Sequence, residues 1–279
     1  MTSPLGLLLD VDGPLASTVT RTLRVPSIAP DLVALAHADV PVVFNTGRSH
    51  AFLVDRVIPV LADAGLRPDA PVWGVGEKGA TWFSLAPDAQ APEAGEVHAA
   101  TELRPPRALL ERIRALAAEE TRLMFWDETK ETMISIEQNL DVSNEDYLAA
   151  QPALVTACQD VIDDLGLAGE FHIVPTIISI DIEHVTAGKA LGAARALQLI
   201  EARTTPPTKW FTAGDSPSDY DMATWLHERG DDVTHLDVRP SGDARDVPYA
   251  VIREIPEPGR AEDDLTALHL ARLRAQIGA

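Results

Sequence analysis

The sequence has 279 residues, of which 46% are hydrophobic, so the chain can bury a large core and is not expected to be disordered. Its formal net charge of −20 at pH 7 disfavours nucleic acid and anionic membranes as partners. The same charge would repel a phosphorylated substrate unless the site supplies a cation, which favours a metal ion over a basic patch. With a single cysteine, Cys158, the chain can form neither an internal disulfide nor a cysteine-based zinc site.

The amino-terminal segment lacks the basic region of a signal peptide. No hydrophobic run approaches the roughly 20 residues that a membrane span needs. We therefore expect a cytoplasmic protein with no membrane partner.

The first third of the chain alternates strands with helices. Three apolar runs have the length of buried strands in a parallel sheet: 7–9, 40–44 and 72–75. Ser27 and Ser49 are of a residue type that caps helices, and an amphipathic pattern follows each of them. This repeated order of strand, turn and helix is typical of a doubly wound α/β sheet.

The pattern changes after residue 85. Residues 86–95 are rich in Pro, Ala, Asp and Gly, as in a linker. Beyond them we expect a helix, a hairpin, a helix and a second hairpin, at 106–120, 122–137, 144–167 and 171–183. Because this order is typical of an α+β domain, we predict that residues 86–178 form a domain inserted between two parts of the core, 1–85 and 179–279.

The strand-and-helix pattern then resumes. A helix is expected to begin near Lys189, and an apolar strand covers 210–214. Further elements are expected at 221–229, 233–238, 249–252 and 262–276. The predicted core is thus a Rossmann-like parallel sheet.

Polar residues follow three of the apolar strands. Asp10 and Asp12 come after the first, Thr46 after the second, and Asp215 and Asp219 after the strand at 210–214. The carboxyl ends of parallel strands meet at the edge where α/β proteins bind ligands. Four carboxylates there would repel one another without a divalent cation, and oxygen ligands favour Mg²⁺.

These residue types suit phosphoryl transfer. One carboxylate can attack phosphorus to form an aspartyl phosphate, and a second can act as general acid and then general base. A hydroxyl and the ammonium of Lys189 can hold the phosphate oxygens.

Four motifs in this order resemble those of the haloacid dehalogenase-like (HAD) superfamily. Residues 10–15 (DVDGPL) resemble its first motif, DxDGTL, and residues 45–48 (NTGR) resemble the second. Residues 187–191 (AGKAL) and 214–219 (GDSPSD) resemble the third and fourth. The resemblance covers essentially the whole chain, and the insert is similar in size and position to the large cap of the sugar-phosphate phosphatase branch. That branch includes Cof-like, sucrose-phosphate and trehalose-phosphate phosphatases.

The resemblance implies a role for each matching residue. Asp10 would be the nucleophile, and Asp12 the general acid and base that favours a phosphatase over a dehalogenase. The residues assigned to phosphate binding are Thr46, Gly47 and Lys189, and those assigned to the Mg²⁺ site are Asp10, Asp12 (through its carbonyl), Asp215 and Asp219. The candidates for substrate contact are Arg48, Glu77, Lys78 and Lys130.

Three positions depart from the motifs, and they bear on turnover more than on fold. Pro14 stands where Thr is usual, Ser218 where Asn is usual, and Ala190 where Gly is usual. Pro14 removes one backbone donor but leaves the amides of the two preceding motif residues.

Other interpretations of single motifs are weaker. An EF-hand beginning at Asp10 would need Glu at its twelfth position, where the chain has Arg21. A P-loop ending at Lys189 would need Gly at 183 and Ser or Thr at 190, where the chain has Glu183 and Ala190.

The sequence therefore predicts a Mg²⁺-dependent phosphatase for a small phosphorylated metabolite, with a sugar phosphate as the best substrate class. Two alternatives stay open. One is a phosphotransferase or phosphomutase using the same site, and the other is a binding protein that has kept the fold without turnover.

Overall fold

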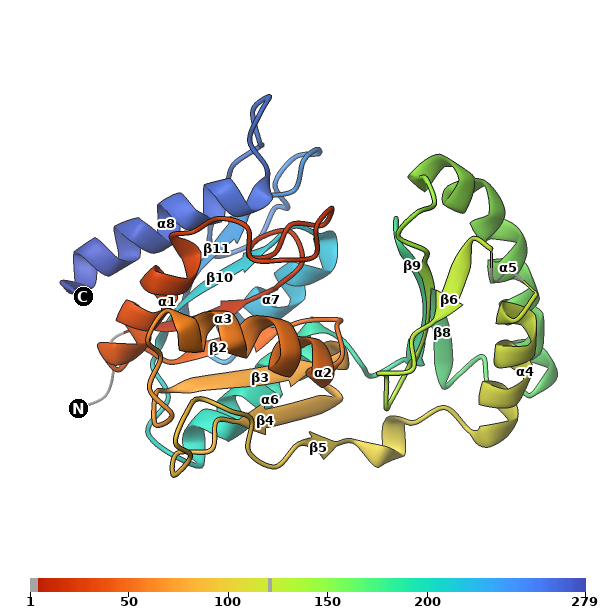
Figure 1. Ribbon diagram of the computed structural model, residues 1–279, viewed down its shortest axis with the longest axis horizontal. Coiled ribbons are helices and arrows are strands. Elements are labelled where there is room, and N and C mark those ends of the chain that lie inside the picture. Colours follow the sequence, from red (N-terminus) through yellow and green to blue (C-terminus); the bar gives the residue numbers. More distant parts are fainter. Residues whose placement is uncertain (1–4, 120–121) are drawn as a thin grey trace. The chain divides into compact units, whose positions relative to one another are not determined.

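The computed structural model describes residues 5–119 and 122–279 (Figure 1). The chain forms two compact units: the first comprises the chain up to His98 together with Gly188–Ala279, and the second comprises Ala99–Ala187. None of the helices described in these ranges combines the length and the hydrophobicity that a bilayer crossing requires.

The boundaries of the second unit lie later in the chain than the predicted ones at 86 and 178. At the first boundary, the short strand β5 (His98–Ala99) still pairs with the edge of the large sheet of the first unit. At the second, β9 (Ser179–His184) hydrogen-bonds to strands of the second unit. Backbone pairing therefore extends past the composition change at 86–95 and past the predicted second boundary at 178.

The first unit is built on an eight-stranded sheet. In sheet order its strands are β12 (Ala250–Arg253), β11 (Asp232–Asp237), β10 (Lys209–Gly214), β1 (Gly6–Leu9), β2 (Val42–Asn45), β3 (Val72–Gly76), β4 (Thr81–Ser84) and β5. Strands β12 to β3 run parallel, and β4 is antiparallel to β3. The predicted α/β class and doubly wound sheet are confirmed, with an antiparallel edge. Strand β1 lies between β10 and β2, so the residue after β1 sits in the middle of the sheet edge.

Helices cover both faces of this sheet (Figure 1). One face packs against α1 (Ile28–His37), α3 (Ile58–Asp63) and α8 (Glu262–Ile277), and the other against α6 (Lys189–Glu201) and α7 (Tyr220–Glu228). Strand β1 is fully buried: Leu7 and Leu9 belong to the first core, whereas Leu8 belongs to the second. Two covered faces explain why the parallel strands are continuously apolar.

The two serines predicted to cap helices behave differently. Ser49 is extended, and its hydroxyl accepts a hydrogen bond from the amide of Phe52 at 3.3 Å, as expected of an N-cap. Ser27 occupies the N-cap position of α1 but its side chain makes no capping hydrogen bond, so that prediction is wrong. The helix after Ser49 is divided into α2 (His50–Phe52), a π-helical turn (Leu53–Val57) and α3. Pro59, two residues after the end of the turn, has no amide hydrogen to continue the α-helical ladder.

The second unit is an α+β arrangement, as predicted for the insert. Its antiparallel sheet has the order β6 (Met124–Trp126), β7 (Ile134–Gln138), β9, β8 (Phe171–Pro175). Helices α4 (Arg107–Ala117) and α5 (Asn144–Asp164) pack on one face, where Cys158 is buried (Figure 1). Ile134 and Ile136 face this core, so the alternate residues of β7 lie on the other face.

Candidate active site

The parallel strands bring three of the motifs together at one edge of the large sheet. Asp10, Thr46 and Asp215 are the first residues after β1, β2 and β10, which are neighbours in the sheet. Backbone hydrogen bonds continue the ladder to the site: the amide of Asp10 donates to the carbonyl of Ala213 at 3.0 Å. The expectation that these strand ends converge is therefore met.

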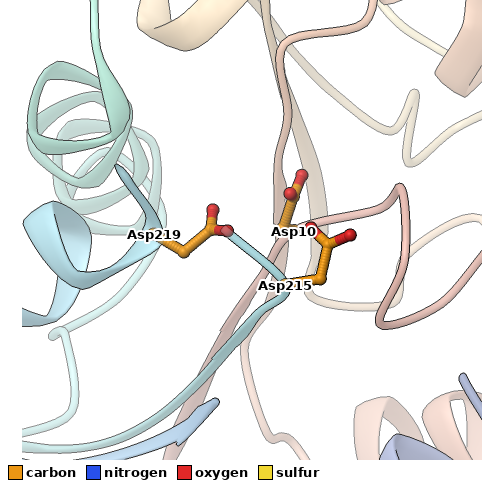
Figure 2. Close-up of side chains that lie close together, drawn as sticks. All are labelled: Asp10, Asp215 and Asp219. Atoms are coloured by element: carbon orange, nitrogen blue, oxygen red, sulfur yellow. The ribbon is translucent and has the colours of Figure 1, made fainter. Parts of the chain in front are cut away.

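Three carboxylates lie close together at this edge. One oxygen from each of Asp10, Asp215 and Asp219 lies within 4.8 Å of the others. Figure 2 shows Asp10 and Asp215 side by side, with the carboxylate of Asp219 directed toward them. Glycine makes this packing possible, because a Cβ at Gly13 would overlap the Asp215 carboxylate and one at Gly214 would overlap Asp219.

Asp219 is held rigidly in this group. It is fully buried in the 3-10 turn Pro217–Asp219, between β10 and α7. Its Oδ2 accepts hydrogen bonds from the amide and the hydroxyl of Ser216, at 2.9 and 2.7 Å. These two bonds fix the orientation of the carboxylate, and its Oδ1 lies 2.7 Å from the ammonium of Lys189.

Lys189, the first residue of α6, is buried among oxygen atoms. Its Nζ lies 2.7 Å from Oδ1 of Asp10 and donates to the carbonyl of Asn45 at 2.8 Å, in addition to the contact with Asp219. An ammonium group has three hydrogens, and these three oxygens match them. Burial lowers the pKa of Lys189, but the carboxylates of Asp10 and Asp219 raise it more strongly, so this side chain stays charged.

One lysine does not neutralise the whole group. Burial, together with the neighbouring Asp219 and Asp12, raises the pKa of Asp10 to about 7 despite the opposing effect of Lys189. Burial and the carboxylates of Asp10, Asp219 and Asp12 also raise the pKa of Asp215 well above its ordinary value. Hard oxygen donors that hold excess negative charge fit a divalent cation, which would be bound by Asp10, Asp215 and Asp219.

Asp12 is in a different environment from these three. Its carboxylate accepts two hydrogen bonds from Arg48, at 2.8 Å from Nε and 3.0 Å from Nη2. Its side chain is 25% exposed, so solvent reaches it. The metal-binding role of the Asp12 carbonyl stays a prediction. Arg48, a candidate substrate contact, is thus bound to the candidate general acid.

The other candidates for phosphate and substrate binding adjoin Thr46. Thr46 is fully buried, and its hydroxyl accepts a hydrogen bond from the amide of Arg48 at 3.1 Å. Lys78 lies in the 3-10 turn Glu77–Gly79; its amide donates to the carbonyl of Thr46 at 2.9 Å and its carbonyl accepts from Gly188 at 2.8 Å. Glu77 and Lys78 both have left-handed backbones, with φ of 47° and 54°.

Two of the predicted residues contribute differently. A Cβ at Gly47 would make only ordinary contact with Lys78, so the backbone there is open on that side. Lys130 belongs to the second unit, in the connection between β6 and β7, where its Nζ lies 3.9 Å from Sδ of Met133. The roles of both residues stay predictions.

The sequence analysis missed a layer of buried polar side chains beneath the site. Asn45 ends β2 and is fully buried, as is His235 on β11, which hydrogen-bonds to Thr212 at 2.8 Å. The hydroxyl of Tyr220 donates to the buried carboxylate of Asp237 at 2.6 Å. The available signal was a polar residue inside or at the end of an apolar strand.

Comparisons with known proteins agree with this geometry at the level of fold. No family model matches the sequence, and no curated protein matches it. Among solved structures, the C-terminal domain of trehalose-6-phosphate phosphatase from C. albicans is similar with a TM-score of 0.69 at 14% identity, over 98% of this chain and 93% of that one. A trehalose-6-phosphate phosphatase from Aspergillus fumigatus is similar with a TM-score of 0.55 at 16% identity, over 97% and 92% of the two chains.

A haloacid dehalogenase-like hydrolase from Bacteroides thetaiotaomicron is also similar, with a TM-score of 0.60 at 12% identity over 97% of this chain and 100% of that one. The chain therefore has the fold of the HAD-like hydrolases, which confirms the fold that the four motifs indicated. These identities establish the fold, and the substrates in the names belong to those proteins.

Proposed function

We propose that this protein is a Mg²⁺-dependent phosphatase that hydrolyses a small phosphorylated metabolite through an aspartyl-phosphate intermediate on Asp10. The observation that carries the proposal is the arrangement around Asp10: its Oδ1 lies 2.7 Å from the ammonium of Lys189, and one oxygen each of Asp215 and Asp219 lies within 4.8 Å. A nucleophilic carboxylate, a fixed cation and a hard-oxygen metal site are the parts that phosphoryl transfer requires.

In this mechanism each residue has a separate task. A carboxylate oxygen of Asp10 attacks phosphorus while Asp12 donates a proton to the leaving oxygen. Asp12, now a carboxylate, then takes a proton from the water that cleaves the aspartyl phosphate. Thr46 and Lys189 hold the phosphate oxygens, and Mg²⁺, when bound, supplies positive charge that offsets the carboxylates and the phosphate.

We propose a sugar phosphate as the substrate class. The trehalose-6-phosphate phosphatases among the similar structures support this choice, and an IMP-nucleotidase from Plasmodium falciparum, similar with a TM-score of 0.52, makes nucleotides the competing class. A cytoplasmic location stays a prediction.

Two of the motif departures are accommodated by local hydrogen bonds, which supports turnover over mere binding. Beside Pro14, the amide of Gly13 donates to the carbonyl of Ala16 at 2.8 Å and closes the turn. Ser218 hydrogen-bonds to Ser216 at 2.8 Å, and the hydroxyl of Ser216 donates to the carboxylate of Asp219. We therefore favour a phosphatase over a non-catalytic binding protein.

The test is phosphate release from p-nitrophenyl phosphate, trehalose 6-phosphate, other sugar phosphates and IMP, with and without Mg²⁺. We expect Mg²⁺-dependent release, fastest with a sugar phosphate. Asp10→Asn should abolish it, whereas Asp55→Asn, which changes an exposed aspartate in the same unit, should not.

Three other outcomes would redirect the proposal. Transfer of the phosphoryl group to an added sugar instead of water would identify a phosphotransferase or phosphomutase. If phosphate release were fastest from IMP, nucleotides would replace sugar phosphates as the proposed substrate class. No release from any compound by folded, metal-bound protein would favour the binding protein.

A further inference from the structure

Asn45 makes two connections to Lys189, through its side chain and through its backbone. Its Nδ2 donates to the backbone carbonyl of Lys189 at 3.0 Å, and its own carbonyl accepts from Nζ of Lys189 at 2.8 Å. The two residues are 144 positions apart in the sequence. Lys189 is therefore held at both ends by one residue, at the point where α6 begins.

The cost of burying Asn45 argues that this arrangement matters. The residue is fully buried, and among the described residues its Oδ1 has no hydrogen-bond partner. A buried polar atom without a partner is unfavourable, and an apolar side chain at the end of this apolar strand would avoid that penalty. The benefit of the amide is its Nδ2 donor, which hydrogen-bonds to the carbonyl of Lys189. The other neighbour of Nδ2 is Sδ of Met222, at 3.7 Å.

Helix α6 has a glycine, Gly192, where the side-chain amide of Asn45 packs against it. Gly192 lies one turn after Lys189, and a Cβ at this position would overlap the side-chain amide of Asn45. Glycine is unfavourable inside a helix compared with alanine. Its presence in the first turn of α6 is explained by the space that Asn45 occupies.

We propose that Asn45, with the space left by Gly192, is a positioning residue that sets the start of α6 so that the ammonium of Lys189 reaches Asp10 and Asp219. This inference rests on the proposed function, because the task of Lys189 is taken from it. Loss of the amide should leave the ammonium free to shift among its acceptors, so that it meets Asp10 and the phosphate less often in the reactive geometry.

The decisive variants exploit the steric match between positions 45 and 192. Gly192→Ala alone should destabilise the protein, because the new methyl group collides with Asn45. In Asn45→Ala/Gly192→Ala the smaller residue at 45 makes room, so thermal stability should return to that of Asn45→Ala or above. The turnover number with p-nitrophenyl phosphate should nevertheless stay lower than that of the wild type by about 10- to 100-fold. The matched control is Met222→Leu, which removes the other neighbour of the amide and should leave turnover unchanged.

A second measurement, by NMR, monitors the surroundings of the Lys189 ammonium without relying on turnover. The ¹⁵N signal of its buried ammonium, assigned by its loss in Lys189→Met, should shift or broaden in Asn45→Ala and in the double variant but not in Met222→Leu. Wild-type turnover and a wild-type Lys189 signal in the stable double variant would overturn the inference. If the wild-type protein has no phosphatase activity, the proposed function fails, and the ammonium signal still decides whether Asn45 positions Lys189.

Discussion

The two carboxylates of the DVDGPL motif, two residues apart, occupy opposite kinds of surroundings. Asp10 is buried against Lys189 with two further carboxylates nearby, and its pKa is raised to about 7. Asp12 is partly exposed and paired with Arg48 through two hydrogen bonds. The buried group is held by the charge of Lys189, whereas solvent reaches the carboxylate of Asp12. In the proposed mechanism the first carboxylate is the nucleophile and the second is the acid and base.

The largest effect should come from removing the cation of the buried group. Lys189→Met leaves the carboxylates of Asp10 and Asp219 without their ion-pair partner, and loss of one member of a buried ion pair costs about 3–5 kcal/mol. Urea unfolding without metal measures the change. Lys209→Met, which breaks an exposed pair with Asp232, should cost no more than about 1 kcal/mol. Equal losses in the two variants would refute the view that the buried group depends on fixed charge.

The free energy of unfolding should also depend on pH through the buried His235. Burial lowers the pKa of His235 to about 4, below its ordinary value of 6.5, so the folded protein keeps this ring neutral. Between these values the unfolded chain carries a proton on this ring that the folded chain does not, so the contribution of His235 to stability decreases as pH falls from about 6.5 to about 4. The loss from this residue is about 3 kcal/mol. Asp10, whose pKa is raised to about 7, contributes in the opposite direction.

The free energy of unfolding, measured at several pH values, checks this expectation. Because the other titrating groups are common to both proteins, the free energy of unfolding of His235→Asn relative to the wild type should rise by about 3 kcal/mol between pH 6.5 and pH 4. That of His98→Gln, which changes an exposed histidine, should not. A difference between His235→Asn and the wild type that stays constant over this range would contradict the expectation.

Metal binding should relieve the excess negative charge of the buried group. Mg²⁺ at about 100 times its Kd should stabilise the folded protein by about 2.7 kcal/mol, because it binds a site that the unfolded chain lacks. Thermal unfolding with Mg²⁺ and with EDTA measures this difference. Asp215→Asn should reduce it, and Asp55→Asn should not; an unchanged response in Asp215→Asn would exclude Asp215 as a ligand.

The smallest effect on stability should come from a change in the pair of Arg48 and Asp12. Arg48→Lys keeps the charge but loses the two-pronged geometry, so Asp12 should be less well oriented and kcat should fall about tenfold. The stability change should stay within about 1 kcal/mol because lysine keeps the positive charge and solvent reaches the carboxylate of Asp12, although the Arg48 side chain is only 10% exposed. Steady-state kinetics tests this expectation, with Arg56→Lys, a change at an exposed arginine, as the control. An unchanged kcat in Arg48→Lys would show that Arg48 does not orient Asp12 for catalysis.

The sequence was sufficient to predict the strands and the edge at which the motifs meet, because apolar runs and parallel topology determine both. It was not sufficient for contacts between side chains that are distant in the chain. The pairing of Arg48 with Asp12 and the contact of Asn45 with Lys189 depend on rotamers and on the packing of α6. The bounds of the second unit differ from the expected ones because the backbone pairing of β5 and β9, which the sequence pattern does not show, extends past residues 86 and 178.

The backbone of Lys78 has a consequence for how such a site can diversify. Its amide and carbonyl join the segment after β2 to the segment before α6, so the main chain, rather than the side chain, connects the two predicted phosphate-binding segments. The identity of residue 78 can therefore change while the frame persists, provided that the new residue accepts a left-handed backbone. Asparagine or glycine satisfies this condition, whereas valine and isoleucine do not. Recognition can in this way evolve next to the chemistry without disturbing it.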